Sequence, residues 1–182
     1  MLGIFLGLVL EQTKFPGKKL VVRVNRTLMG APPVVIGLLT YMLLRKKGPF
    51  GALRWVFTIK GMVAAQVLII TPIVCGMVYS YAVRTEPSIR AFARTMGADR
   101  HQTARLLLRE MKNEIYFAVV SGYGRSISEV GAVFLVGGNI KNSTRTMTTA
   151  ISTLKGAGDY YEGVFLGVIL MLLAFAVQTL AE

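Results

Sequence analysis

The segment at residues 84–138 reads RTEPSIRAFARTMGADRHQTARLLLREMKNEIYFAVVSGYGRSISEVGAVFLVGG, and its order of polar and apolar parts determines the predicted architecture. Its first half is polar and basic and predicts two short helices separated by Gly97, the first of which begins near Thr85 and Pro87. Its second half, residues 115–137, is an apolar run of about 23 residues that holds one arginine and one glutamate. This order predicts a charged platform outside a membrane, joined to a helix inside it.

The hairpin of two helices is expected over residues 84–113. Gly97 is a natural helix stop. Asp99, followed three residues later by Gln102, resembles a capping box, which predicts that the second helix begins at once. Gly97, Ala98 and Asp99 therefore form a tight corner in the prediction. Seven basic residues keep the hairpin out of the hydrocarbon: Arg84, Arg90, Arg94, Arg100, Arg105, Arg109 and Lys112.

The composition places most of the chain in a membrane. The 182 residues are 53% hydrophobic and 16% charged, whereas a soluble domain has about 25% charged residues. The apolar residues come in blocks, and the basic residues that give the net charge of +12 fall almost wholly between them. Lysines and arginines in such places set topology and contact lipid headgroups. We therefore expect membrane lipid, and no nucleic acid, as a partner.

Few residues could carry chemistry. Cys75 is the only cysteine and His101 the only histidine, so neither an intrachain disulfide nor a metal site is expected. The sequence offers no glycine-rich phosphate loop with a lysine, no paired acids at a cleft and no serine–histidine pair. We therefore expect no enzyme activity and no cofactor on this chain. If the system uses ATP, another chain must bind it.

The apolar blocks predict an all-α, polytopic membrane protein with a single domain over residues 1–182. Five spans are expected, at about residues 2–10, 28–44, 61–83, 115–137 and 161–180. A helix that crosses a bilayer needs about 20 residues. The first block is therefore interpreted as the second half of a span whose start lies before Met1, with a short interfacial or re-entrant piece as the alternative.

The basic residues of the loops predict the topology. Loops 11–26, 45–60, 84–114 and 138–160 carry five, five, seven and three lysines and arginines. Since successive loops alternate between faces, the first and third together carry twelve and the other two carry eight. The positive-inside rule then predicts that the first and third loops face the cytoplasm.

Two charged residues lie inside the predicted span at 115–137. An arginine such as Arg125 near the centre of a span costs about 2.5–3.5 kcal/mol on insertion scales. Glu129 follows one helical turn later, so the two side chains share a face and could form an ion pair. Two interpretations stay open. The pair holds the helix bundle together, or Arg125, Ser128 and Glu129 line a path for an anion.

Two segments resemble the permease subunit of type I ABC importers: ARTMGADR, which begins at Ala93, and GRSISEVGA at residues 124–132. In that family a glutamate-alanine-alanine segment, three residues and a glycine mark the cytoplasmic loop that docks into a cleft of the ATPase. Ala93 and Gly97 match this pattern. Ala91 stands in place of the glutamate, and Phe92 in place of the first alanine.

Other segments are similar to the molybdate, sulfate and tungstate branch of that family. SEVGAVFLV at residues 128–136 resembles the branch as a whole, and GGNI at 137–140 with RTMTTAI at 145–151 resembles the tungstate permeases in particular. Upstream, FPG at 15–17 and APPVV at 31–35 fit as well. The resemblance therefore covers nearly all of the chain.

The resemblance implies an ATP-driven oxyanion importer of the cytoplasmic (inner) membrane, for tungstate or, as alternatives, molybdate or sulfate. It implies a cytoplasmic subunit that binds ATP and Mg²⁺ and docks around Ala93, Gly97, Ala98 and Asp99, and an extracytoplasmic protein that delivers the oxyanion. Two permease copies would line the path, and ATP would move the hairpin to produce alternating access. The resemblance also implies at least one further helix before Met1.

Two other classes of protein remain as alternatives. An ATP-independent anion transporter or channel would use Arg125 and Glu129 unaided, but it gives no reason for a two-helix platform. A membrane scaffold would carry the same charges for purely structural purposes. A disruptive substitution at Gly97 separates the three, because only the importer would lose its coupling to ATP hydrolysis.

Overall fold

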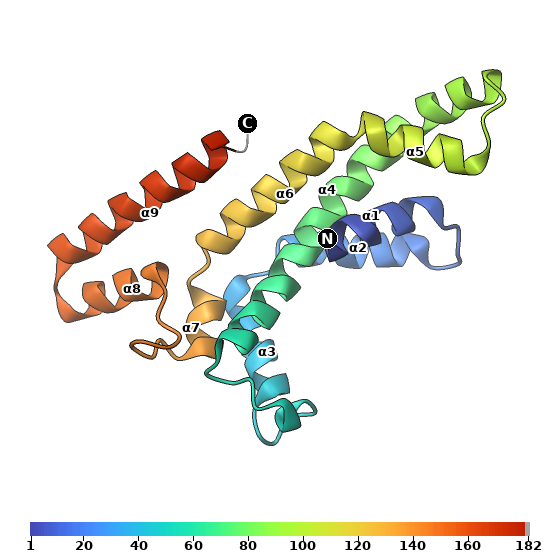
Figure 1. Ribbon diagram of the computed structural model, residues 1–182. Coiled ribbons are helices and arrows are strands. Elements are labelled where there is room, and N and C mark those ends of the chain that lie inside the picture. The colour runs from blue at the N-terminus through green and yellow to red at the C-terminus, as the bar shows by residue number, and fades with distance from the viewer. Residues whose placement is uncertain (181–182) are drawn as a thin grey trace. The chain divides into compact units, whose positions relative to one another are not determined.

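A computed structural model describes residues 1–180, and every regular element in that part of the chain is helical (Figure 1). The elements are α1 (Leu2–Gln12), α2 (Lys18–Met29), α3 (Pro33–Leu44), the 3₁₀ turn η1 (Gly51–Leu53), α4 (Ile59–Thr95), α5 (Arg100–Glu110), α6 (Lys112–Ile127), α7 (Gly131–Gly137), α8 (Met147–Ala157) and α9 (Tyr160–Leu180). The prediction of an all-α fold is therefore confirmed.

Two helices in the described part, α4 and α9, are long and apolar enough to cross a membrane. A third crossing results if α2 and α3 together form one broken span. Helix α1 is apolar but has only 11 residues, fewer than the roughly 20 that a crossing needs. The predicted apolar segments at 61–83 and 161–180 lie within α4 and α9.

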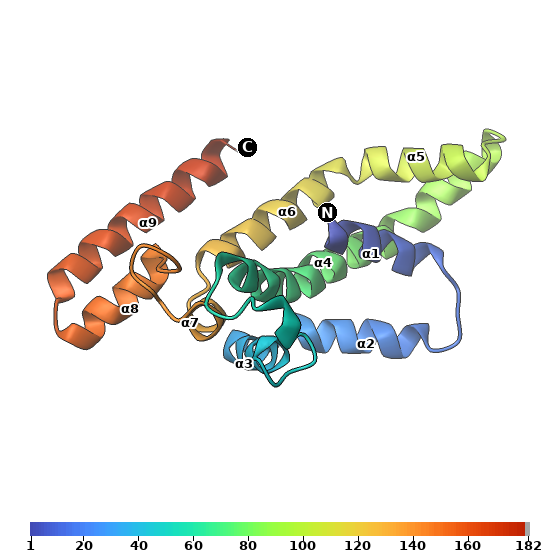
Figure 2. The ribbon, with the colours of Figure 1, turned by 60° about the horizontal axis from the view of Figure 1, so that its bottom comes forward.

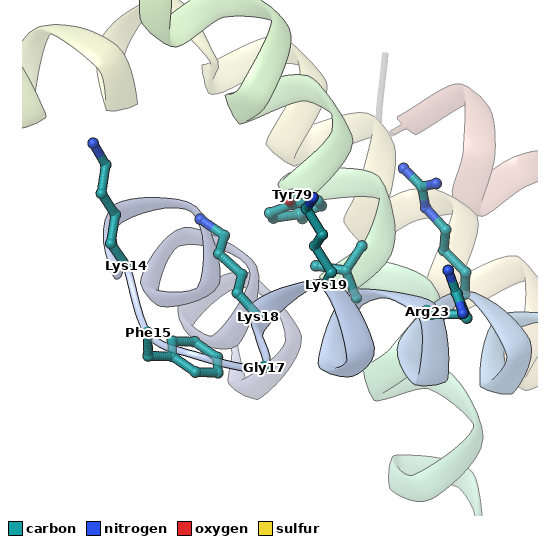
Figure 3. Close-up of a pocket in the computed structure, with 9 residues that line it drawn as sticks. Lys14, Phe15, Gly17, Lys18, Lys19, Arg23 and Tyr79 are labelled. Atoms are coloured by element: carbon teal, nitrogen blue, oxygen red, sulfur yellow. The ribbon is translucent and has the colours of Figure 1, made fainter.

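The chain forms two compact units, which are described separately. The first unit consists of Met1–Gly30 and Ile70–Gly122. In it, α5 runs back beside the last turns of α4, as both ribbon views show (Figure 1, Figure 2). An open pocket, here called the basic pocket, lies beside the α1–α2 loop (Figure 3). It is lined chiefly by Lys14, Lys18, Lys19, Arg23, Arg26 and Tyr79.

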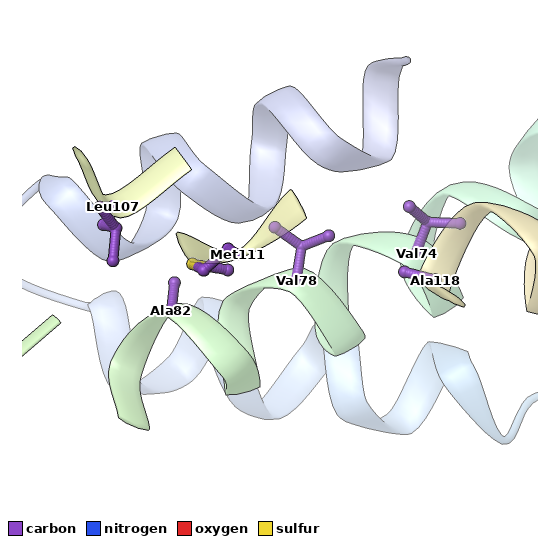
Figure 4. Packing of buried hydrophobic residues seen from close by; sticks show 6 residues of the cluster. All are labelled: Val74, Val78, Ala82, Leu107, Met111 and Ala118. Atoms are coloured by element: carbon purple, nitrogen blue, oxygen red, sulfur yellow. The ribbon is translucent and has the colours of Figure 1, made fainter. Parts of the chain in front are cut away.

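The core of the first unit joins the hairpin to α4. Its buried residues are Val74, Val78, Ala82, Leu107, Met111 and Ala118 (Figure 4). Leu107 of α5 and Met111, the residue that follows α5, lie against the α4 side chains, and Met111 is fully buried. A buried aliphatic side chain of this size contributes about 1.5–3 kcal/mol. The hairpin is therefore packed against α4 and is not a free loop.

The second unit consists of Ala31–Ile69 and the described residues from Tyr123 onward. In it, α3 packs against α7 and α8 packs against α9. Phe57 ties the loop before α4 to α7, because its backbone N–H donates to the Val136 carbonyl at 2.9 Å. The ring of Phe57 lies 6.2 Å from that of Tyr41. Phe57 therefore connects α7 with α3 through the segment that precedes α4.

The predicted span at 28–44 forms α3 only from Pro33 onward, and its first two residues belong to α2. Helix α2 ends at Met29, and α3 begins at Pro33 after a break at Gly30, Ala31 and Pro32. A residue before proline is pushed out of the helical region, and here two prolines follow one another. Pro33 itself sits at the first position of α3, where its missing N–H costs nothing.

The run at 115–137 is not one helix either. Helix α6 ends at Ile127 and α7 starts at Gly131, so the chain is unwound at Ser128, Glu129 and Val130. An unwound backbone inside an apolar segment is stable only where other groups replace the lost helical hydrogen bonds. Those groups are described with the site below.

The first hairpin helix does not begin near Thr85 and Pro87, as the sequence predicted. Helix α4 continues to Thr95 with Pro72 and Pro87 inside it. Because Pro87 has no N–H, the carbonyl of Val83 lacks its helical hydrogen bond. Both residues are exposed, so the missing hydrogen bond does not leave a buried carbonyl unpaired. The hairpin therefore begins as a direct extension of the apolar helix.

The contact between α3 and α7 predicts the effect of a small substitution. A Cβ added at Gly37 would lie 2.5 Å from the Cα of Ala132, so Gly37→Ala must push the two helices apart. Overpacking of this kind costs about 1–3 kcal/mol. We expect Gly37→Ala to lower the unfolding temperature in detergent. The matched control is Gly167→Ala on α9, where the added methyl meets no atom within 4 Å. Equal unfolding temperatures for the two variants would contradict the packing described here.

Candidate functional site

The first part of the candidate site is the corner between α4 and α5. Gly97 has a φ of +67°, a left-handed conformation that glycine adopts without steric cost. The Ala98 N–H donates to the Ala93 carbonyl at 2.9 Å, and the Gly97 N–H donates to the Arg94 carbonyl at 3.2 Å. These two bonds form a Schellman motif, which ends a helix in one defined geometry. The predicted helix stop at Gly97 is confirmed.

The second helix of the hairpin begins immediately after the corner. The Gln102 N–H donates to the Asp99 carboxylate at 2.7 Å, and the Asp99 N–H donates to the Gln102 side-chain oxygen at 2.9 Å. The predicted capping box is therefore confirmed. Such a cap contributes about 1 kcal/mol. Only Met96, Gly97, Ala98 and Asp99 separate α4 from α5, so the corner has little freedom.

The outer surface of the corner carries unpartnered apolar side chains. Phe92 is 57% exposed and Met96 is 70% exposed, whereas Ala93 is buried at 2%. Arg94 is exposed beside them. Large apolar side chains on a polar, basic element outside the predicted spans are typical of a surface that a partner covers.

A half-buried carboxylate lies near the base of the hairpin in the same unit. Burial raises the pKa of Glu11, at the end of α1, above its ordinary value of 4.5, and the Glu86 carboxylate of α4 adds to the rise. The positive charges of Lys18 and Arg90 oppose it. Arg90 itself pairs with Glu86 one helical turn away.

The raised pKa of Glu11 predicts a pH dependence of stability. The folded protein binds the proton of the Glu11 carboxyl more tightly than the unfolded chain does. Protonation of Glu11 therefore stabilises the fold, and this stabilisation is lost as pH rises from about 4.5 through the pKa of Glu11 in the folded protein. We expect Glu11→Gln to flatten the fall in unfolding temperature above pH 4.5. The effect is below about 1 kcal/mol because solvent screens the group. Glu110→Gln, at an exposed position of α5, is the control. Parallel pH profiles for wild type and Glu11→Gln would refute the prediction.

The second part of the candidate site is the unwound segment between α6 and α7. Glu129 is 7% exposed, and one of its carboxylate oxygens accepts from the Ala132 N–H at 3.3 Å. Its backbone carbonyl accepts from the Thr148 hydroxyl of α8 at 3.4 Å. Gln66 of α4 donates to the carbonyl of Ser126 at 3.4 Å. The side chains of Gln66, Glu129 and Thr148 thus form hydrogen bonds with backbone groups that lose their helical partners at the break.

Arg125 and Glu129 lie near one another but are not tightly paired. The shortest nitrogen–oxygen distance is 3.8 Å, and the Arg125 side chain is 44% exposed. The exposed Ser128 donates its hydroxyl to the carbonyl of Arg125 at 3.1 Å. The guanidinium therefore keeps N–H groups for another acceptor. All three residues that the sequence marked as a possible anion path are brought together here.

Two residues of this segment escaped the sequence analysis. These residues are Gln66 of α4 and Thr148 of α8. No local signal identifies their partner carbonyls, which lie 60 and 19 residues away. In the described residues, no group of three or more His, Cys, Asp or Glu side chains is placed to hold a metal ion.

Two helices able to cross a membrane, a polar hairpin and an unwound charged turn are features of an integral membrane protein. A family profile described as "binding-protein-dependent transport system inner membrane component" matches residues 2–182, and the chain belongs to that family. It is therefore a permease component of an ABC transport system in the inner membrane.

Curated relatives resemble this chain along most of its length. The tungstate uptake system permease protein TupB of Peptoclostridium acidaminophilum is 38% identical over 177 residues, which are 97% of this chain and 76% of that protein. A probable anion ABC transporter permease protein of Haloferax volcanii is 36% identical over 98% of this chain and 79% of its own length. The molybdenum transport system permease protein ModB of Escherichia coli K12 is 28% identical over 84% and 70%.

Proposed function

We propose that this chain is the membrane subunit of an ATP-driven importer for a tetrahedral oxyanion, with tungstate as its substrate. The observation that carries the proposal is the 38% identity to a tungstate permease over 97% of the chain. Molybdate and sulfate have the same shape and charge, and relatives that transport molybdenum and sulfate are more distant in sequence, at 28% identity.

In this proposal, a separate ATP-binding subunit docks on the corner formed by Ala93, Gly97, Ala98 and Asp99. The exposed side chains of Phe92 and Met96 supply apolar contact area, and the two capping motifs make the corner rigid. ATP and Mg²⁺ are held by that partner. A rigid contact is required because a flexible loop would absorb the movement of the partner.

Movement of the corner reaches the membrane by two routes. Helix α4 is continuous from the apolar segment to Thr95, and α5 is fixed to α4 through the buried Leu107 and Met111. When the ATP-binding partner moves the corner, the attached helices tilt. Two copies of the permease would then open alternately to an external binding protein and to the cytoplasm.

The substrate path is proposed to pass the segment that contains Arg125, Ser128 and Glu129. A guanidinium group binds tetrahedral oxyanions through several N–H donors at once, and the 3.8 Å separation from Glu129 leaves these donors available. The unwound backbone supports this role, because irregular backbone within an apolar region is tolerated where it lines a cavity.

The proposal is tested by oxyanion-stimulated ATP hydrolysis. The permease is purified with candidate ATP-binding and oxyanion-binding partners and reconstituted in membranes. We expect tungstate to stimulate hydrolysis, and Arg125→Lys to retain more of that stimulation than Arg125→Gln, because only lysine keeps the charge. If no tested oxyanion stimulates hydrolysis in a complex that contains all partners, the proposed function is wrong.

A further inference from the structure

The basic pocket of the first unit is not part of the corner or of the unwound segment. It has a volume of about 730 Å³ and is formed by the α1–α2 loop, the first turns of α2 and Tyr79 of α4. Figure 3 shows the side chains of Lys14, Lys18 and Lys19 extending to the side on which Tyr79 lies. Five positive charges therefore surround one hollow.

None of these charges forms an ion pair in the described residues, although the Glu11 carboxylate interacts electrostatically with Lys18. Among residues 1–180, the two ion pairs are Arg90 with Glu86 and Arg125 with Glu129, and neither involves the basic pocket. Lys18 is held in place by the carbonyls of Glu11 and Thr13, at 2.8 and 3.0 Å, and its ammonium lies 5.7 Å from the centre of the Tyr79 ring. Like charges at this density repel one another unless an anion lies between them.

The same helix exposes an apolar face. Leu20, Val21, Val24 and Leu28 are between 41% and 63% exposed, and no residue of α2 is buried. They follow one stripe of the helix, whereas Lys19, Arg23 and Arg26 follow another. At 12 residues, α2 spans about 18 Å and is too short to cross a bilayer alone. A short helix with one cationic and one apolar face is typical of the boundary between headgroups and acyl chains.

We propose that the basic pocket binds the phosphate of an anionic phospholipid, whose acyl chains cover the exposed apolar stripe of α2. A free oxyanion would satisfy the positive charges but leave the apolar stripe in water, whereas a phospholipid satisfies both. The positive-inside rule predicts that this loop faces the cytoplasm, where anionic lipids attract basic segments. The inference does not depend on which anion the protein transports.

The test measures lipid retained by the purified full-length protein. The protein is reconstituted in nanodiscs of phosphatidylcholine with increasing phosphatidylglycerol, released into the gas phase, and weighed with its bound lipids by native mass spectrometry. We expect wild type to retain phosphatidylglycerol in preference to phosphatidylcholine. The double variant Lys19→Gln/Arg23→Gln should bind it about 25-fold more weakly, since each basic residue near an anionic surface contributes about fivefold.

Two matched variants isolate the site. Lys46→Gln/Lys47→Gln removes the same charge from exposed positions outside the basic pocket and should leave retention unchanged. Lys19→Arg/Arg23→Lys keeps the charge and should retain the lipid, which separates loss of charge from loss of folding. Equal retention by wild type and by the charge-removing pocket variant would overturn the proposal.

A further arm distinguishes a lipid from a free anion. Inorganic phosphate or tungstate at millimolar concentration should not displace phosphatidylglycerol, and Leu20→Ser/Val24→Ser should weaken lipid retention. If free phosphate or tungstate displaces the lipid, and the serine variant retains it normally, the basic pocket is an oxyanion site and the lipid proposal is wrong.

Discussion

Gly97→Pro should strongly weaken the coupling of transport to ATP hydrolysis while leaving the helices folded. Proline fixes φ near −65° and has no N–H, whereas Gly97 has a φ of +67° and donates to the Arg94 carbonyl. The corner must therefore change shape at the surface where the ATP-binding partner is proposed to dock. We expect oxyanion uptake to fall by about 5- to 150-fold, the range that coupling free energies of 1–3 kcal/mol produce.

Three substitutions at position 97 test whether the left-handed backbone conformation of the corner is what coupling requires. Asparagine tolerates the left-handed region better than alanine does, so activity should fall in the order Gly97→Asn, Gly97→Ala, Gly97→Pro. Gly156→Ala in α8 is the control, since its added methyl meets no atom within 4 Å. Helix content by circular dichroism should be the same for all variants. Normal ATP-driven uptake by Gly97→Pro would show that the corner does not transmit movement.

Glu129→Ala should lower the stability of the second unit. It leaves the Ala132 N–H without its acceptor and Arg125 without its nearest negative charge. An orphaned buried donor costs about 1–3 kcal/mol. We expect a lower unfolding temperature in detergent and loss of uptake, because the unwound turn loses the group that starts α7. An unfolding temperature equal to that of wild type would mean that Glu129 does not hold this turn.

Glu129→Gln separates the hydrogen bond of Glu129 from its charge. The glutamine side-chain oxygen can still accept from the Ala132 N–H, so Glu129→Gln should lower the unfolding temperature less than Glu129→Ala does. Removing the negative charge beside Arg125 should lower the oxyanion concentration that gives half-maximal uptake, if the anion passes this arginine. An unchanged or higher concentration would favour the alternative interpretation, in which the two residues only hold the helices together.

The corner could be predicted from the sequence because its signals are local. Gly97 is the residue that a left-handed helix end prefers, and Asp99 with Gln102 forms a cap within four consecutive residues. The apolar blocks likewise identified the long helices, because hydropathy over about 20 residues reports burial in lipid directly.

The unwound turn could not be predicted, because its stability depends on distant partners. The spacing of Arg125 and Glu129 fits a continuous helix equally well, so the sequence favoured a single span over residues 115–137. The break is stable because Gln66 and Thr148 donate hydrogen bonds to the carbonyls of Ser126 and Glu129. It is also stable because Gly37 lets α3 approach Ala132 closely. At Pro87 the sequence predicted a helix start, but α4 continues through this residue. An exposed proline inside an established helix removes only one hydrogen bond.

The most direct measurement is tungstate uptake into sealed vesicles that hold the purified permease, with and without its ATP-binding partner. If the hairpin transmits movement from that partner to the helices, uptake requires the partner and ATP together and stops when either is left out. Uptake at the full rate by the permease alone, without nucleotide, would contradict this account and would identify the chain as an independent anion transporter.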